Sequence, residues 1–188
     1  GMSGAVLKTI IDTYDFSPYK TLVDIGGGNG AMMFAVLSAT PESTGIVFDE
    51  PYVIEQTAQH IPEDLKGRCT VLGGSFFEEV PAGADLYMTK WVIHDWNDDQ
   101  SIKILKNIQK AMPVGGKLLI IDSVIPDDSR NTPHAGKLLD INIMAMTTGK
   151  ERTLSEFKFL LESAGLTFKN LIQTATEISS IIECEKLI

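Results

Sequence analysis

The sequence contains little cysteine. Its 188 residues include two, Cys69 and Cys184, and they lack the spacing of a metal-binding cluster or a disulfide framework. Thiols without such a pattern are typical of a reducing compartment. Residues 6–14 mix apolar side chains with Lys8 and Asp12, which is not the pattern of a secretory signal peptide. We therefore expect a cytoplasmic location.

Basic residues and long apolar runs are also scarce. The chain has 16 Lys and Arg residues against 25 Asp and Glu, a net charge of −9, whereas a nucleic-acid binder usually presents a basic face. The densest apolar stretch, at 117–122, is far shorter than the roughly 20 residues that a membrane-spanning helix needs. We expect neither nucleic acid nor a membrane as partner, which leaves a small-molecule substrate.

What the sequence does contain is an alternation of helix and strand patterns. Hydrophobic residues make up 44% of the chain, which is ordinary for a folded domain. Strand-to-helix units predict an α/β, Rossmann-like fold, a mostly parallel sheet with helices on both faces. Two final strands without a helix between them predict an antiparallel hairpin at one edge. The expected strands are 21–25, 45–48, 69–72, 85–89, 117–121, 167–172 and 178–184, and the expected helices are 6–14, 31–39, 52–60, one capped by Asn97 and one beginning near Thr153.

A glycine cluster follows the first expected strand. Residues 26–30 include four glycines, among them Gly26, Gly28 and Gly30. Glycine permits positive φ and close approach of a ligand to the backbone, and the helix that follows offers free N–H groups. We expect a nucleotide-like ligand here. The alternative is a tight turn that binds nothing.

Asp24 helps to choose the ligand. The spacing Gly26-x-Gly28-x-x-Ala31 also fits the dinucleotide fingerprint. A carboxylate at Asp24 would repel a pyrophosphate but attract an ammonium and a sulfonium group, and S-adenosylmethionine carries both. Asp49, at the end of the second strand, suits the ribose of either cofactor. The terminal hairpin favours a methyltransferase, and the alternatives are a nicotinamide-dependent oxidoreductase or a cofactor-binding domain without methyl transfer.

The segment 90–96 follows the fourth expected strand and places His94 at the ligand end of the sheet. A phenol has a pKa of about 10, so an imidazole that takes the hydroxyl proton would assist methyl transfer. An acid on the other ring nitrogen would hold the correct tautomer. Asp122 and Glu151 are candidates, although a solvated strand-end acid and a helix N-terminal charge explain them equally well. No metal is expected.

The motifs at 22–30, 48–51, 73–77, 93–96 and 149–153, taken in this order, resemble the catalytic domain of the small-molecule O-methyltransferases of the caffeic acid and acetylserotonin type, whose bacterial members act on polyketide and other aromatic hydroxyls. The resemblance covers essentially the whole chain. It implies the class I methyltransferase fold with a seven-stranded sheet, S-adenosylmethionine as cofactor and S-adenosylhomocysteine as product.

The resemblance also implies roles for individual residues. His94 would be the general base and Glu151 an orienting acid. Asp122 stands where plant members carry a glutamate and is one methylene shorter, which leaves its reach to His94 open. The cofactor-binding residues would be Asp24, Gly26, Gly28, Gly30, Asp49, Glu50, Ser75, Phe76 and Lys90, with Phe76 beside the adenine.

Two features leave alternatives. Ser75 stands where the family usually has an aspartate that accepts a hydrogen bond from the adenine amino group, so cofactor affinity is reduced or the site has drifted neutrally. The substrate-binding residues would be Met2, Trp91, Asn142, Met144 and Met146. The methionine-rich run at 143–146 also fits an ordinary helix core.

Family members normally carry an N-terminal helical dimerisation domain. We therefore interpret residues 1–188 as one cofactor-binding catalytic domain, with 1–16 as the linker helix from that missing domain, and expect the full-length protein to be a homodimer. An exposed apolar patch on Val6, Ile10 and Ile11 would fit this interpretation.

Overall fold

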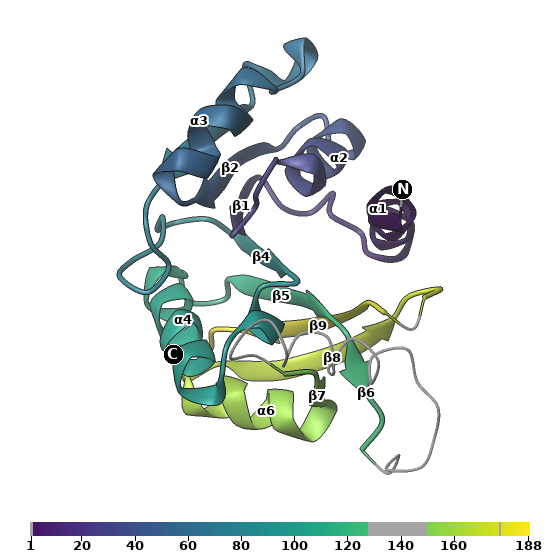
Figure 1. Cartoon of the computed structure of the whole chain (residues 1–188), viewed down its shortest axis with the longest axis vertical. Coiled ribbons are helices and arrows are strands. Elements are labelled where there is room, and N and C mark those ends of the chain that lie inside the picture. Colours follow the sequence, from purple (N-terminus) through teal and green to yellow (C-terminus); the bar gives the residue numbers. More distant parts are fainter. Residues whose placement is uncertain (1, 128–149, 177) are drawn as a thin grey trace.

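The fold is built on a seven-stranded, mostly parallel sheet, seen in a computed structural model that describes residues 2–127, 150–176 and 178–188 (Figure 1). The strand order is β3-β2-β1-β4-β5-β9-β8. Strands β1 to β5 pair in parallel, whereas β9 is antiparallel to both of its neighbours, β5 and β8. The expected α/β fold with a C-terminal antiparallel hairpin at the sheet edge is therefore confirmed.

The elements lie close to where the sequence predicts them. The strands of the large sheet are β1 Thr21–Ile25, β2 Thr44–Asp49, β3 Cys69–Gly73, β4 Leu86–Lys90, β5 Lys117–Asp122, β8 Thr167–Gln173 and β9 Ser180–Glu185. The α-helices described are α1 Met2–Thr13, α2 Ala31–Ala39, α3 Pro51–Gln59, α4 Asp98–Ala111 and α6 Leu154–Ser163. Short 3₁₀ turns are η1 Glu63–Leu65 and η2 Ile93–Asp95. The largest difference is at α1, which begins at Met2 rather than Val6.

Two apolar clusters cover the two faces of the sheet. On one face α4 and α6 contribute Leu105, Ile108 and Phe157 among others. On the other face lie α1, α2 and α3 (Figure 1). Burial of apolar surface on both faces explains why the strands read as continuous hydrophobic runs.

Val6, Ile10 and Ile11 do not form the exposed apolar patch that would have fitted the interpretation of α1 as a linker helix. Val6 is 1% exposed and Ile10 is 0% exposed, because both join the apolar cluster that α2 and the sheet form, and Ile11 packs against the same cluster. The apolar stripe of α1 therefore meets this chain's own core. Cys69 and Cys184 are buried free thiols, and no helix in the described part of the chain is long and apolar enough to cross a membrane.

A small second sheet was not expected from the sequence. β6 Val124–Ile125 pairs in parallel with β7 Arg152–Thr153, with Val124 opposite Arg152. Two-residue strands carry too little pattern to be recognised in a sequence. This pairing brings the segment around residue 151 back beside the end of β5.

Helix capping fixes the segments on either side of this pair. Asn97 and Gln100 form a capping box at the start of α4, and Thr153 and Glu156 form another at the start of α6. Each box satisfies backbone N–H groups that the first turn of a helix leaves free. Both helices thus begin within a few residues of the carboxyl edge of the sheet.

The carboxyl ends of the parallel strands form one edge of the sheet, and the strand order reverses between β1 and β4. This is where ligands bind in open α/β sheets.

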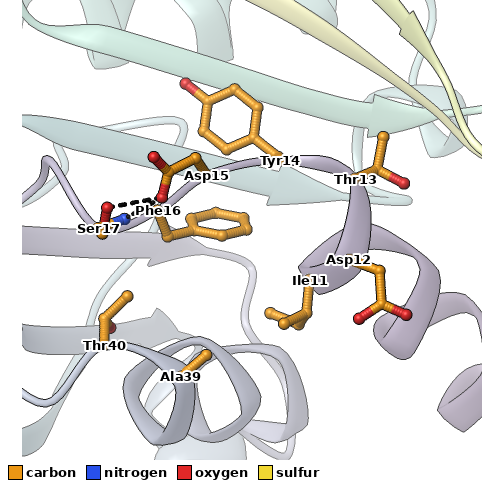
Figure 2. Close-up of a pocket in the computed structure, with 9 residues that line it drawn as sticks. All are labelled: Ile11, Asp12, Thr13, Tyr14, Asp15, Phe16, Ser17, Ala39 and Thr40. Carbon is orange, nitrogen blue, oxygen red and sulfur yellow. Dashed lines mark hydrogen bonds between the residues drawn. The ribbon is translucent and has the colours of Figure 1, made fainter.

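A cavity of about 330 Å³ lies elsewhere, between the loop after α1 and the C-terminal end of α2 (Figure 2). Its polar groups include Asp15, whose carboxylate accepts hydrogen bonds from the backbone and hydroxyl of Ser17. None of the catalytic, cofactor-binding or substrate-binding residues expected from the sequence lines it.

Candidate active site

A cavity of about 460 Å³ opens at the carboxyl edge of the sheet. Its size is within the range of small-molecule sites, about 300–1,000 Å³. The site residues expected from the sequence that line it are Gly26, Asp49, Glu50, Phe76, Lys90 and Trp91. The remaining lining residues are Tyr52, Gly74, Phe77, Val92, Asp95 and Trp96. The sequence analysis assigned no role to these remaining residues. The aromatic residues within 90–96 could have indicated Trp96 as a further lining residue.

The glycine loop, of which Gly26 lines the cavity, has a conformation that requires glycine. Gly26, Gly28 and Gly30 all have positive φ, of 71°, 57° and 83°. A Cβ on Gly26 would lie 2.7 Å from the side chain of Val92. The backbone N–H of Gly28 donates to Asp49 Oδ2 at 2.8 Å. This hydrogen bond joins the loop to the end of β2 through Asp49, the acid that was expected to bind a ribose.

Asp24 lies beneath the loop rather than on the cavity wall. It is 2% exposed, and burial raises the pKa of its carboxyl to about 7, partly opposed by Lys90 and reinforced by Asp49. Burial likewise lowers the pKa of Lys90, which Asp24 opposes. A carboxylate in this position gains from a cation that approaches the loop.

Aromatic rings also line the cavity. Phe76, Phe77 and Trp96 meet edge to face, with ring centroids 4.8–6.1 Å apart. Such a cluster suits a flat heteroaromatic ring. Ser75 is not among the residues that line the cavity. Its hydroxyl accepts a hydrogen bond from the backbone N–H of Phe77 at 3.3 Å. The aspartate that the family usually carries at this position would retain this acceptor and add a charge.

Trp91 lines the cavity from a strained backbone position. It is the one non-glycine residue with positive φ in the described part of the chain, at 55°. Its backbone N–H donates to Ile121 and its indole N–H donates to Ser179 Oγ at 3.1 Å. Strained conformations of this kind persist only where the surroundings hold them, and they concentrate at functional sites.

His94 follows β4 on the turn η2, and two buried carboxylates approach one of its ring nitrogens. Its Nδ1 is 2.8 Å from Asp122 Oδ1 and 3.4 Å from Glu151 Oε1. Asp122 ends β5, and Glu151 immediately precedes β7. The third acid, Asp95, is 3.4 Å from Nε2 and half-exposed. The three predicted catalytic residues therefore come together, and the open reach of Asp122 is sufficient.

The carboxylates dominate the protonation of His94. Burial alone would lower the pKa of the imidazole, but Asp122, Glu151 and Asp95 outweigh it and raise the pKa to about 10. Burial raises the pKa of Glu151, and His94 opposes this shift. In the free protein the ring is therefore an imidazolium at neutral pH.

The same three residues also offer ligand atoms that lie within 4.8 Å of one another, the donor set of a metal site. A metal ion at Nδ1 would have to displace the proton that both carboxylates stabilise. Among the expected substrate residues, Asn142, Met144 and Met146 lie outside the described residues, and for Met2 only the backbone is described.

Comparison with known proteins identifies the family. A family model of the O-methyltransferase domain matches residues 2–167. The chain belongs to this family. It is 41% identical over 182 residues to a phenazine O-methyltransferase of Lysobacter antibioticus, covering 96% of this chain and 53% of that protein. It is also 41% identical to a mitomycin biosynthesis 6-O-methyltransferase of Streptomyces lavendulae, covering 92% of this chain and 49% of that protein.

Solved structures agree. The crystal structure of LaPhzM superposes with a TM-score of 0.92 at 40% identity, covering 98% of this chain and 55% of that one. An O-methyltransferase from neocarzinostatin biosynthesis, in complex with S-adenosylhomocysteine and 1,4-dihydroxy-2-naphthoic acid, superposes with a TM-score of 0.84 at 31% identity, covering 98% and 53%. The chain thus spans about half the length of the relatives it matches.

Proposed function

We propose that this chain is the catalytic domain of an S-adenosylmethionine-dependent O-methyltransferase, which transfers a methyl group to a hydroxyl of a small aromatic or polyketide-like molecule. The observation that carries the proposal is the position of His94, held by Asp122 and Glu151 on a turn whose neighbours line the glycine-loop cavity. A base beside a nucleotide-sized cavity is the arrangement that methyl transfer to a hydroxyl requires.

The residues present fit this cofactor. The glycine loop admits close approach, Asp49 lines the cavity beside it, and the Phe76 wall accepts an adenine. Asp24 places a buried carboxyl group beneath the loop. Its ionised form would repel a pyrophosphate and attract an ammonium group. This charge, together with family membership, favours S-adenosylmethionine over a nicotinamide cofactor. When bound, the cofactor supplies an electrophilic methyl group on a sulfonium sulfur.

His94 would take the proton of the acceptor hydroxyl through Nε2. Nδ1 faces Asp122 and Glu151, so the ring is oriented with Nε2 as the exchanging nitrogen. The pKa of about 10 is close to that of a phenol, about 10, so proton transfer between them is nearly balanced. A cationic ligand near the ring lowers its pKa and increases the neutral fraction that can act as a base.

We also propose that the full-length protein is a cytoplasmic homodimer in which residues 1–16 lead from a dimerisation domain. The support is the family resemblance and the greater length of the relatives. The proposed substrate class is supported by the aromatic residues that line the cavity and by the names of those relatives, a phenazine O-methyltransferase and an O-methyltransferase of mitomycin biosynthesis.

Isothermal titration calorimetry with S-adenosylhomocysteine and, separately, NAD tests the cofactor. We expect binding of the first and none of the second, and the reverse result would overturn the proposal in favour of an oxidoreductase. A methyl-transfer screen with S-adenosylmethionine against phenols, including 1,4-dihydroxy-2-naphthoic acid, tests the reaction. Cofactor binding without transfer to any hydroxyl would favour the cofactor-binding-domain alternative.

His94→Ala tests the base. We expect methyl transfer to fall by about 10²-fold or more, with the affinity for S-adenosylhomocysteine, which lacks the sulfonium charge, largely unchanged, because His94 does not line the cavity. A variant that keeps full activity on the same acceptor would remove His94 from the mechanism.

A further inference from the structure

Arg152 is completely buried at the edge of the candidate site. Its side chain is 0% exposed, although it carries a permanent charge. It is the first residue of β7 and directly follows Glu151. Buried arginines require several acceptors, because the guanidinium has five N–H donors that lose their hydration. The acceptors it finds here are informative.

The guanidinium binds the backbone of the turn that carries His94. Nη1 donates to the carbonyl of Ile93 at 3.1 Å, and Nη2 donates to the carbonyl of Trp96 at 2.8 Å. These two residues flank His94 on either side, so the arginine spans the turn η2. Ser101 Oγ lies 3.4 Å from Nη2 and 3.4 and 3.3 Å from the same two carbonyls.

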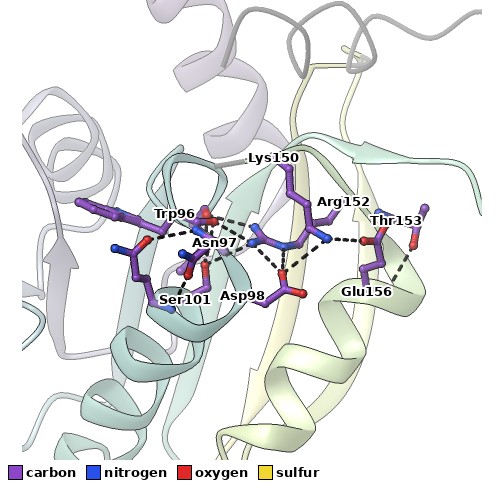
Figure 3. Close-up of polar contacts among 10 residues, drawn as sticks. Trp96, Asn97, Asp98, Ser101, Lys150, Arg152, Thr153 and Glu156 are labelled. Carbon is purple, nitrogen blue, oxygen red and sulfur yellow. Dashed lines mark hydrogen bonds and ion pairs between the residues drawn. The ribbon is translucent and has the colours of Figure 1, made fainter. Parts of the chain in front are cut away.

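The counter-charge comes from the start of α4. Nε and Nη2 both donate to Asp98 Oδ1, at 3.1 and 3.0 Å (Figure 3). Asp98 is half-exposed and is also approached by Lys150 at 3.7 Å. The guanidinium therefore ties together β7, η2 and the first turn of α4. A lysine has three donors around one atom and cannot reproduce this planar fork.

Glu151, which precedes β7, and Arg152, its first residue, thus both hold His94. The Glu151 carboxylate contacts the imidazole, while Arg152 contacts the backbone behind it. From the end of β5, Asp122 contacts both Nδ1 and the backbone N–H of His94, the latter at 3.2 Å. Arg152 does not touch the imidazole in any of these contacts, so its influence on His94 passes through the turn.

We propose that Arg152 is a positioning residue, whose guanidinium fixes the turn η2 so that Nδ1 of the His94 imidazole stays beside Asp122 and Glu151. The inference rests on the proposed function for its catalytic meaning. A displacement of about 1 Å at a reacting group can cost about 10²-fold in rate, so a clamp on the backbone matters even though it is remote from the acceptor.

The test follows the ring resonances of His94 by NMR from mildly acidic to alkaline pH in the whole chain and in Arg152→Met. The groups that face His94 are Asp122 on β5, Glu151 before β7 and Asp95 on η2. If positioning is lost, the carboxylate contacts weaken and the pKa of His94 falls. Removal of a nearby positive charge without movement would raise it, and a purely structural role would leave it unchanged. Either of those two results would overturn the proposal.

Further variants keep the test decisive if Arg152→Met does not fold. Arg152→Lys retains the charge but not the fork, and we expect the same fall in the pKa of His94. Asp98→Asn weakens one side of the clamp at a half-exposed position, and we expect a smaller fall. An unchanged pKa in both folded variants would overturn the proposal.

A matched control exists in the chain. Arg68 donates to the carbonyls of Leu37, Thr40 and Ser43 at the end of α2, away from the site. We expect Arg68→Met to lower thermal stability without moving the pKa of His94. An equal shift in the pKa of His94 in Arg68→Met would show that the loss of any arginine with several carbonyl contacts has this effect. That result would overturn the proposal.

Calorimetry with S-adenosylhomocysteine on the same variants separates the two levels of inference. If the unmodified chain does not bind S-adenosylhomocysteine, the proposed function is contradicted. The NMR result would still show whether Arg152 fixes the turn η2. Binding that is retained in Arg152→Lys, together with a shifted His94, is the result we expect.

Discussion

Nδ1 of His94 lies 2.8 Å from Oδ1 of Asp122, although the two residues come from separate strand ends and are 28 positions apart. Their strands, β4 and β5, are parallel neighbours. The second oxygen of the same carboxylate accepts the backbone N–H of His94 at 3.2 Å. One aspartate therefore contacts both the ring and the backbone of the candidate base. The longer glutamate that plant members carry at this position is not needed for these contacts.

This contact predicts an order of effects on His94. Asp122→Asn should lower the pKa of the imidazole more than Glu151→Gln does, because the Asp122 contact is shorter, 2.8 Å against 3.4 Å, and charge interactions weaken with distance. NMR titration of the ring measures both. A larger effect of Glu151→Gln would reverse the assignment of the dominant partner.

Stability should depend on pH through His94. The folded-state pKa, about 10, is raised above the ordinary value of 6.5. The folded protein therefore binds the proton more tightly, and the stability that His94 contributes is complete below about pH 6.5 and is lost as pH rises towards 10. Urea unfolding of the unmodified chain and of His94→Gln measures the difference, which we expect to shrink over this window. A difference that grows with pH would contradict the raised pKa.

Asp24 predicts a pH dependence of cofactor affinity. Its pKa of about 7 leaves the carboxyl partly neutral in the free protein, whereas a ligand with an ammonium group prefers the carboxylate. Affinity for S-adenosylhomocysteine should therefore rise with pH up to about 7, by at most about ten-fold per unit. Calorimetry should find this slope reduced in Asp24→Asn and preserved in Asp15→Asn, a control beside the other cavity (Figure 2). An unchanged slope of affinity against pH in Asp24→Asn would show that a group other than Asp24 causes the pH dependence.

Ser75 offers a gain of affinity. Ser75→Asp should tighten cofactor binding, because a carboxylate accepts a stronger, charge-assisted hydrogen bond from an adenine amino group while it can still accept from the N–H of Phe77. Ser75→Ala is the reference variant, because alanine accepts a hydrogen bond neither from the adenine amino group nor from the N–H of Phe77. Unchanged or weaker binding of Ser75→Asp in a titration with S-adenosylhomocysteine would favour neutral drift at this position.

The glycine loop predicts a loss of binding. Gly26→Ala should lose about 1–2 kcal/mol of stability, because φ is 71° and side chains disfavour that region, and should also displace Val92, which lies 2.7 Å from the added Cβ. Gly83→Ala has φ of 88° and nothing within 4 Å, so it should cost stability alone. Thermal unfolding and calorimetry compare the two. Equal cofactor affinity in both variants would show that the loop conformation is not required.

Much of the fold was predictable because its signals are local. The run 21–25 and the glycines after it predict β1 and its loop, and Asn97 and Thr153 mark the starts of α4 and α6. The site residues His94, Asp122 and Glu151 were predictable as candidates from their places at strand and helix ends. Their roles came from family resemblance, because an acid at a strand end has the same sequence pattern whether it is solvated or catalytic.

Other features depend on contacts between distant segments. The pairing of β6 with β7 involves two residues on each side, too few to carry a periodic pattern. The burial of Val6 and Ile10 depends on α2 lying against α1, which the amphipathic stripe of α1 does not specify. Arg152 was part of a recognised motif, but its acceptors are backbone carbonyls of residues 93 and 96, and every residue type carries a carbonyl.

The sequence by itself determined the order of helices and strands, the glycine loop and the acid beneath it, because backbone preferences and apolar periodicity act over a few neighbouring residues. Tertiary structure decided which charges meet. Parallel pairing of β4 with β5, and of β6 with β7, brings Asp122 and Glu151 to His94. Only there does burial strengthen their interaction enough to keep the imidazole protonated, since electrostatic interactions depend on distance and on the exclusion of water.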